Sequence, residues 1–402
     1  MIQDVKRLKK MNKKLVMLLI LCTVILSGCW DSKEPGRMFY IYGVGLDFKD
    51  DEYHLYAQLI DFASIAKSEQ PPNPNIVQAE IGHANAKTLN EAFYKLYQSL
   101  DEELYWGHLT YLVFSEDVLH AGKVSDIMNT FTRFNDTRYQ TWVYATRDSI
   151  KDVMLTKPIL NKAITLSKLS DPLNSYKQYS FIEPINIRKL IVSIDEPNYE
   201  VRLPLVTLTK IWKSEKGSNT ETAINGIGIV TPHSFKGFLT NEQISGLQWL
   251  SNETIRTGIS IDLKPNSSSG NEEKRLSVVL EKNKVKIKPI DTNGDVKFDI
   301  NVEMVAIVSG FQGNISEPEV QKIIEGEVKK QIKKTYEEGL NIDADVYQLS
   351  NQLYRKEAKK WNEIQKGGDI KLTDDSIRNI HVKVKVNSGR KSLKETIGKK
   401  LR

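Results

Sequence analysis

The sequence predicts an α+β protein built from three mixed units whose sheets are mainly antiparallel. Its 402 residues, at about 100–200 residues per domain, suffice for two or three domains with substantial cores. Pairs of short apolar or alternating segments are joined by turn residues, which is typical of antiparallel hairpins. Helical patterns with capping signals lie among them. The composition, 40% hydrophobic and 27% charged, excludes a disordered, collagen-like or multi-span membrane protein.

The chain starts with a basic stretch and a short apolar run. Six Lys and Arg residues lie between Lys6 and Lys14, and twelve residues, almost all of them apolar, follow from Leu15 to Leu26. A membrane-spanning helix needs about 20 apolar residues, so this run is too short for one. A basic segment before a short apolar core is typical of a secretory signal peptide. We expect residues 1–28 to be that peptide, with Met1 or Met11 as its start.

The apolar run ends in a sequence that resembles the lipobox of bacterial lipoproteins, Leu26-Ser27-Gly28-Cys29. The resemblance implies cleavage before Cys29 and a diacylglyceryl group on its thiol. The alternative is a core helix in which Cys29 is an ordinary thiol. Because Cys22 would leave with the peptide, the mature chain would have no free thiol, disulfide or thiolate metal site.

The charge of the chain sits mostly at its two ends. Of the formal net charge of +6, residues 1–28 hold +5. Residues 383–402 carry eight basic residues and one acid, whereas residues 29–382 carry 43 basic and 49 acidic residues. The basic balance is therefore no evidence for nucleic-acid binding. The tail either contacts anionic headgroups or an acidic loop of a partner, or is a solvated strand edge and chain end.

The first predicted domain, residues 29–205, starts with a polar tether over 29–37. Residues 38–47 and 53–60 form two apolar strands around Asp50-Asp51, a hairpin. Thr88 and Glu91 have the spacing of a capping box before an apolar helical face. Strands are expected over 108–114 and 139–145, with a helical stretch from Ser115 to about residue 134 between them.

A small middle domain is expected over residues 206–263. It comprises a strand at 223–230, a turn, a return strand at 237–239, and a helix capped by Thr240 or Asn241 that reaches about residue 251. Polar residues 264–274 form a loop or linker.

The third domain, residues 275–390, precedes a basic tail over 391–402. Strands are expected at 276–281, 285–290, 296–308 and 381–386. Ser316 and Glu319 have the spacing of a second capping box, before a helix that ends at Gly339. A second long helix is expected over 345–364.

Several segments in this order resemble the Ger(x)C family, the lipoprotein C subunits of nutrient germinant receptors in endospore-forming bacteria. They are Leu26–Asp31 with Glu34, Gly43-Val-Gly45-Leu-Asp47, Thr88–Ala92, Gly107-His108, Arg133 with Arg138, Asn225–Leu250, and Asp343-Ala-Asp-Val-Tyr347 leading to Trp361. The resemblance covers essentially the whole mature chain.

The resemblance implies three α+β domains in an elongated arrangement, anchored by lipid to the outer face of the spore's inner membrane. The chain would work beside two integral-membrane subunits, A and B, that sense nutrients and trigger ion release. The family is not known for enzymatic activity. No cofactor and no ligand-binding residue is implied.

The residues themselves carry no catalytic motif. We find no Gly-x-Ser-x-Gly, His-Glu-x-x-His or Walker sequence, and the six histidines have no ligand spacing. Gly43-Val-Gly45 and Gly226-Ile-Gly228 favour strand bulges or close backbone approach over a dinucleotide loop. Residues 291–295 favour a hairpin over a calcium loop.

Two further groups have alternative interpretations. Arg133 and Arg138 could bind an anion, but ordinary ion pairing is favoured. Tyr94, Tyr97 and the Tyr105-Trp106 pair favour core and interface positions over a ligand cage.

We therefore expect no catalytic and no metal-binding residue, and a lipid-anchored receptor subunit with Cys29 as its anchor. The alternative is a solute-binding lipoprotein of an ABC-type importer. That class needs two lobes with parallel sheets and crossover helices, whereas the hairpins here argue for antiparallel pairing. A surface hydrolase is a third reading without a supporting motif.

Overall fold

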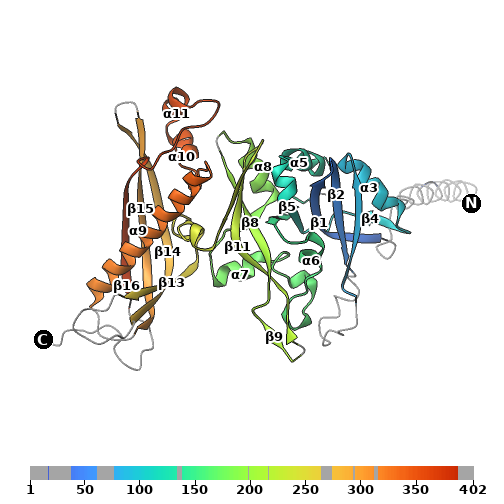
Figure 1. Ribbon diagram of the computed structural model, residues 1–402, viewed down its shortest axis with the longest axis horizontal. Coiled ribbons are helices and arrows are strands. Elements are labelled where there is room, and N and C mark those ends of the chain that lie inside the picture. The colour runs from blue at the N-terminus through green and yellow to red at the C-terminus, as the bar shows by residue number, and fades with distance from the viewer. Residues whose placement is uncertain are drawn as a thin grey trace, which may run out of the picture.

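The computed structural model describes residues 17, 38–60, 77–133, 138–197, 199–215, 217–263, 274–292, 295–311 and 316–387. Figure 1 shows an elongated molecule. A large sheet with its helices forms one end, and a smaller sheet crossed by a long helix forms the other end. The predicted α+β class with mainly antiparallel sheets is confirmed. The predicted tether and the basic tail 391–402 lie outside the described residues.

The large sheet has ten strands, eight of which follow one another in the order β12-β11-β8-β6-β5-β1-β2-β3. Two short strands, β4 (Glu103–Tyr105) and β7 (Ile185–Asn186), pair with β1 and β6. The bounds of the eight strands are β1 Met38–Lys49, β2 Glu52–Ile60, β3 Ala79–Ala86, β5 Tyr111–Ser115, β6 Trp142–Thr146, β8 Val201–Thr209, β11 Glu221–Val230 and β12 Phe235–Thr240.

The β1–β2 hairpin follows from its turn residues. Asp50 and Asp51 have φ angles of 52° and 60°, which the short polar side chain of Asp tolerates better than most. A two-residue loop with both φ angles positive matches the twist of the flanking strands. The predicted hairpin is confirmed.

The centre of the large sheet is parallel, which the sequence pattern did not indicate. Strands β1, β5, β6 and β8 run in the same direction, with helices in the connections. Every residue of β5 is buried, because helices cover both of its faces. Such continuous apolar runs are typical of parallel strands.

Helices cover the two faces of this sheet. Alternate strand residues face opposite ways, so one face packs on α3 (Leu89–Gln98), α4 (Glu116–His120), α5 (Val124–Thr132) and α8 (Ile187–Asp195). The other face packs on α6 (Ile150–Leu155) and the segment after it. The single helical stretch expected after Ser115 is two helices, because Gly122 turns the chain with a φ of 66°. Thr88 caps α3 as predicted, accepting the N–H of Glu91 at 3.2 Å.

Gly43 permits a close approach, as its position predicted. A Cβ at this position would lie 2.2 Å from the ring of Tyr111 on β5. That ring reaches across β1, and its hydroxyl donates to Gln58 Oε1 at 2.6 Å. Gln58 in turn donates to the carbonyl of Met154 at 2.6 Å, which ties α6 to the sheet.

The small sheet has the order β13-β14-β15-β16. Its strands are β13 Arg256–Leu263, β14 Lys274–Thr292, β15 Asp295–Phe311 and β16 Ile377–Asn387. Strands β14 and β15 form the hairpin expected at residues 291–295, with Thr292 opposite Asp295. The strands expected at 276–281 and 285–290 are one long strand with an irregularity between Glu281 and Lys284.

The long helix α9 (Glu317–Asn341) packs on this sheet through one buried residue per turn, Val320, Ile324, Val328, Ile332 and Tyr336. Ser316 is its N-cap residue, but its side chain makes no capping hydrogen bond. The second long helix, expected over 345–364, is divided into α10 (Leu349–Lys356) and α11 (Ala358–Ile364). Glu357, with φ −140° and ψ 58°, breaks it, and both Leu353 and Trp361 are buried in the core.

Residues 206–263, expected as a middle domain, contribute strands to both sheets. Strands β11 and β12 extend the large sheet from β8, whereas β13 is the edge of the small sheet. The helix expected after Thr240 is two 3₁₀ turns, η4 (Asn241–Ile244) and η5 (Leu247–Trp249), with Thr240 and Gln243 in a capping box. Sheet pairing thus crosses the boundaries expected at 205 and 263, and the division into three domains stays a prediction.

Candidate functional site at the junction of the two sheets

The two sheets meet where η4 and η5 pack against α9. Ile229 and Leu239 of the large sheet belong to the same buried cluster as Ile324 and Ile332 of α9. The junction is therefore a continuous apolar core.

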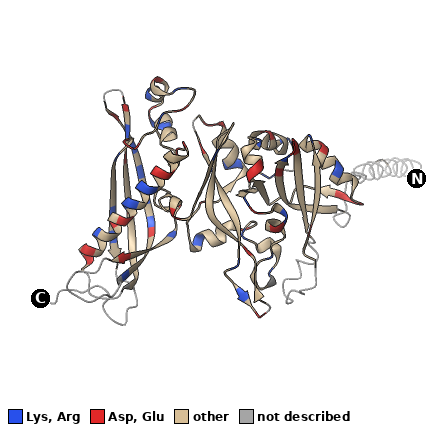
Figure 2. Ribbon diagram, in the orientation of Figure 1, with Lys and Arg blue, Asp and Glu red and all other residues tan. Residues whose placement is uncertain are grey.

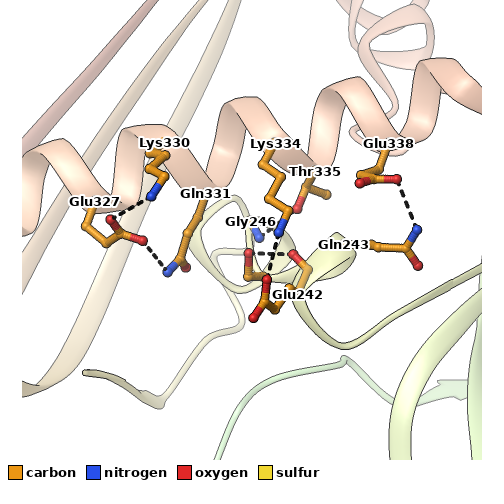
Figure 3. Close-up of polar contacts among 10 residues, drawn as sticks. Glu242, Gln243, Gly246, Glu327, Lys330, Gln331, Lys334, Thr335 and Glu338 are labelled. Atoms are coloured by element: carbon orange, nitrogen blue, oxygen red, sulfur yellow. Dashed lines mark hydrogen bonds and ion pairs between the residues drawn. The ribbon is translucent and has the colours of Figure 1, made fainter. Parts of the chain in front are cut away.

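Polar contacts fix how η4 and η5 lie along α9 (Figure 3). The N–H of Gly246 donates to Thr335 Oγ1 at 2.9 Å, and both residues' atoms are buried. Lys334 Nζ lies 2.8 Å from Glu242 Oε2, and Gln243 Nε2 donates to Glu338 Oε2 at 3.0 Å. Since a buried N–H without a partner is costly, the Gly246 contact defines one register.

Gly246 is needed for this approach. A Cβ at this position would lie 2.6 Å from the carbonyl oxygen of Gln331 and 2.9 Å from Ile332 Cα, both backbone atoms of α9. The hydroxyl of Tyr347 occupies the same space, at 2.3 Å, and donates to the carbonyl of Ile332 at 2.9 Å. The loop after α9, which carries Tyr347, is thereby bonded to the turn of α9 that Gly246 contacts.

One buried carboxyl group, that of Asp345, and one half-buried, that of Glu200, lie beside this loop. The backbone N–H of Asp345 donates to Glu200 Oε2 at 2.8 Å. Burial, and then the charge of Asp345, raise the pKa of Glu200 to about 8, while Lys236 opposes this. Burial also raises the pKa of Asp345 to about 6, against hydrogen bonds from the N–H groups of Ser350 and Leu349. Among the described residues, Asp345 Oδ1 has no hydrogen-bond partner.

Charged and polar side chains surround this pair. Lys236 forms an ion pair with Asp343 at 2.8 Å, Arg202 donates to the carbonyl of Val346 at 3.3 Å, and Glu196 accepts from Arg355 at 2.6 Å. An open cavity of about 710 Å³ adjoins Glu200, Asp345 and Lys236. Burial at the contact between the sheets therefore favours the protonated form of both carboxyl groups.

Cys29, which is predicted to carry the lipid, lies outside the described residues. So do the lipobox residues Leu26, Ser27 and Gly28. In the part of the chain that the structure describes, no helix is long and apolar enough to cross a membrane.

The other candidate residues are spread over the large sheet. Trp106 is buried against Phe93 and Phe131 and donates to the Tyr97 hydroxyl at 3.1 Å, whereas Tyr94 is exposed. The charge of Arg138, after burial, lowers the pKa of His108.

Two histidines meet on neighbouring strands. His54 Nδ1 and His83 Nε2 are 3.2 Å apart. Within the described ranges, no group of three or more His, Cys, Asp or Glu side chains could hold a metal ion.

The sequence pattern did not indicate Glu200, and it predicted no role for Asp345. The signal available was weak: Glu200 is an acid directly before the buried strand β8, and Asp345 lies within the Asp343-Ala-Asp-Val-Tyr347 motif. Glu200 and Asp345 are 145 residues apart in the chain, so no local pattern indicates that they meet.

The fold matches that of a solved structure. The crystal structure of the GerBC protein matches with a TM-score of 0.53, covering 86% of this chain and 96% of that chain at 20% identity. At this identity the likeness shows the fold alone: the chain is an α+β protein of the GerBC fold.

Family models then assign the chain. The spore germination protein N-terminal domain matches residues 31–208, and the spore germination B3/GerAC-like C-terminal domain matches residues 225–389. The chain belongs to the Ger(x)C family of spore germination proteins, which confirms the resemblance. From Bacillus subtilis (strain 168), spore germination protein B3 is 26% identical over 76% of each chain. Spore germination protein KC is 21% identical over 87% of this chain and 89% of that protein.

Gly246→Ala tests the junction. We expect it to lower the free energy of unfolding by about 3 kcal/mol, because the new methyl group overlaps the α9 backbone. Gly326→Ala is the matched control: it lies on α9 with open space around it, and should raise stability by about 0.5–1 kcal/mol. Denaturant unfolding measures both. Equal effects of the two variants would contradict the close approach.

Glu200→Gln tests the buried carboxyl. The pKa of Glu200 is about 8 in the folded chain, and its ordinary value is 4.5. Between these pH values the folded chain keeps the proton, whereas the unfolded chain has lost it. Wild-type stability should therefore fall as pH rises from 4.5 to 8, by up to about 1.4 kcal/mol per pH unit. The variant keeps the acceptor for Asp345 and should flatten thermal stability between pH 6 and 8. Asp343→Asn, with a 96% exposed side chain, should keep the wild-type slope. Parallel curves for wild type and Glu200→Gln would refute the assignment.

Proposed function

We propose that the chain is the lipid-anchored, non-enzymatic C subunit of a nutrient germinant receptor required for spore germination. One observation carries the proposal: the family's N-terminal domain begins at residue 31, two residues after the lipobox Cys29. The family's N-terminal domain thus follows directly after the predicted export signal and its acylation site.

The proposed location is the outer face of the spore's inner membrane. Eight residues lie between Cys29 and the start of β1 at Met38, and the nine Cα–Cα steps reach at most about 30 Å when extended. An acylated Cys29 would therefore keep the large sheet near the bilayer.

The proposed partners are the two integral-membrane subunits, A and B. We also propose that the basic tail contacts anionic headgroups. The role is that of a scaffold or relay, for which the continuous core across the junction is suited. No catalytic residue, cofactor or nucleic-acid partner is proposed. The comparisons give the importer-binding alternative no support.

Purification of the tagged chain from detergent-solubilised spore membranes tests this function. We expect two multi-span proteins to co-purify, and the mature N-terminal peptide to start at Cys29 with a lipid mass that includes palmitate. Cys29→Ala should abolish that mass, weaken membrane retention and impair nutrient germination.

Cys22→Ala is the control, because Cys22 lies in the peptide expected to be removed. It should leave acylation and germination unchanged. Unaltered membrane retention of Cys29→Ala would refute the anchor, and an ATP-driven permease in place of the multi-span pair would refute the receptor role.

A further inference from the structure

Two neighbouring segments expose large apolar side chains. Leu160 and Leu166, which follow α6, are 81% and 62% exposed. Ile211 and Trp212, which join β8 to β9 (Lys213–Ser214), are 78% and 58% exposed. Such side chains are expensive to leave in water, and contiguous ones mark interaction sites. We call these four side chains the apolar surface.

The two segments lie side by side. Leu155 and Lys157 at the end of α6 line one open cavity of about 610 Å³ together with Leu208 and Lys210 at the end of β8. Leu160 and Trp212 follow these residues within three positions. In Figure 1, the β9 hairpin projects from the lower edge of the molecule, next to the segment after α6.

The charge around the apolar surface is positive. Residues 153–170 contain three Lys and no acid, and Lys210 and Lys213 flank Ile211 and Trp212. The nearest acids along the chain are Asp152, which lines the same cavity, Asp171 and Glu215. Figure 2 shows basic colour on the projecting β9 strand. The surface therefore favours an anionic partner.

Hydrogen bonds hold the first segment against the start of the large sheet. The Tyr42 hydroxyl donates to the carbonyl of Thr165 at 3.4 Å, and Ile164 N–H donates to Gln78 Oε1 at 3.0 Å. Tyr42 is four residues from Met38, where β1 begins. The segment that carries Leu160 and Leu166 is thus bonded to β1 near its first residues.

We propose that the apolar surface inserts into the headgroup region of an anionic bilayer. Trp suits this region because its ring is apolar and its N–H is polar, while Leu and Ile enter the acyl boundary. The lysines neutralise lipid phosphates beside them. The inference rests on the proposed function in that the lipid on Cys29 brings this surface to the membrane.

Native Trp212 fluorescence provides the test. The full chain is reconstituted into phosphatidylcholine vesicles with and without phosphatidylglycerol, and floated vesicles are measured with and without brominated lipids. Subtracting the spectrum of Trp212→Phe isolates the Trp212 emission. We expect a blue shift and loss of most of that emission with brominated phosphatidylglycerol vesicles, and a smaller effect without the anionic lipid.

Leu160→Asp should restore much of the emission. Val192→Asp is the matched control, because Val192 is 52% exposed on α8, which packs on the opposite face of the sheet; it should leave quenching unchanged. Flotation itself reports on the Cys29 anchor, so loss of flotation speaks against the proposed function, whereas unquenched Trp212 in floated vesicles overturns this inference. Protection of Trp212 in spore membranes but not in lipid vesicles would assign the surface to a protein partner and likewise overturn it.

Discussion

The contact between Gly246 and α9 determines how the two sheets are joined. Without a side chain at residue 246, the backbone of η4 and η5 reaches the helix, where Thr335 accepts its N–H. Thr335 is wholly buried and uses its hydroxyl across the junction. Apolar burial supplies the attraction, but it is not directional. The hydrogen bond and the steric limit at Gly246 select one register from the many that an apolar contact permits.

The buried carboxyls depend on that same register. The loop that carries Asp345 follows α9, and Tyr347 fixes it to the helix at Ile332. Glu200 precedes β8 of the other sheet and meets Asp345 because the sheets are docked. Opening the junction would hydrate both groups and lower their pKa values, so the closed state binds protons more tightly than an open one. By linkage, rising pH between the ordinary and shifted pKa values weakens the closed state.

The sequence predicted those parts of the fold that depend on residues close together in the chain. Asp50 and Asp51 determine the β1–β2 turn, and Thr88 caps α3 through a residue three positions away. The parallel centre was not predicted, because β5 finds β1 and β6 only through pairing across long connections. The break at Glu357 was not predicted either, since the helical spacing of the apolar residues continues through it. The carboxyl pair of the site depends wholly on tertiary burial, which no local pattern encodes.

The proposed lipid anchor and the junction would together constrain how the chain acts at a membrane. A single lipid on a segment of nine residues would hold the large sheet near the bilayer yet leave it free to rotate. A second contact, through Leu160 and Trp212, would restrict that rotation, because a body attached at two points turns only about the line between them. Since one core runs from β11 to α9, the small sheet would follow the orientation of the large one. If a membrane partner displaced the small sheet, one of two movements would follow. Either the whole molecule would tilt as a rigid body on the bilayer, or the contact at Gly246 would open.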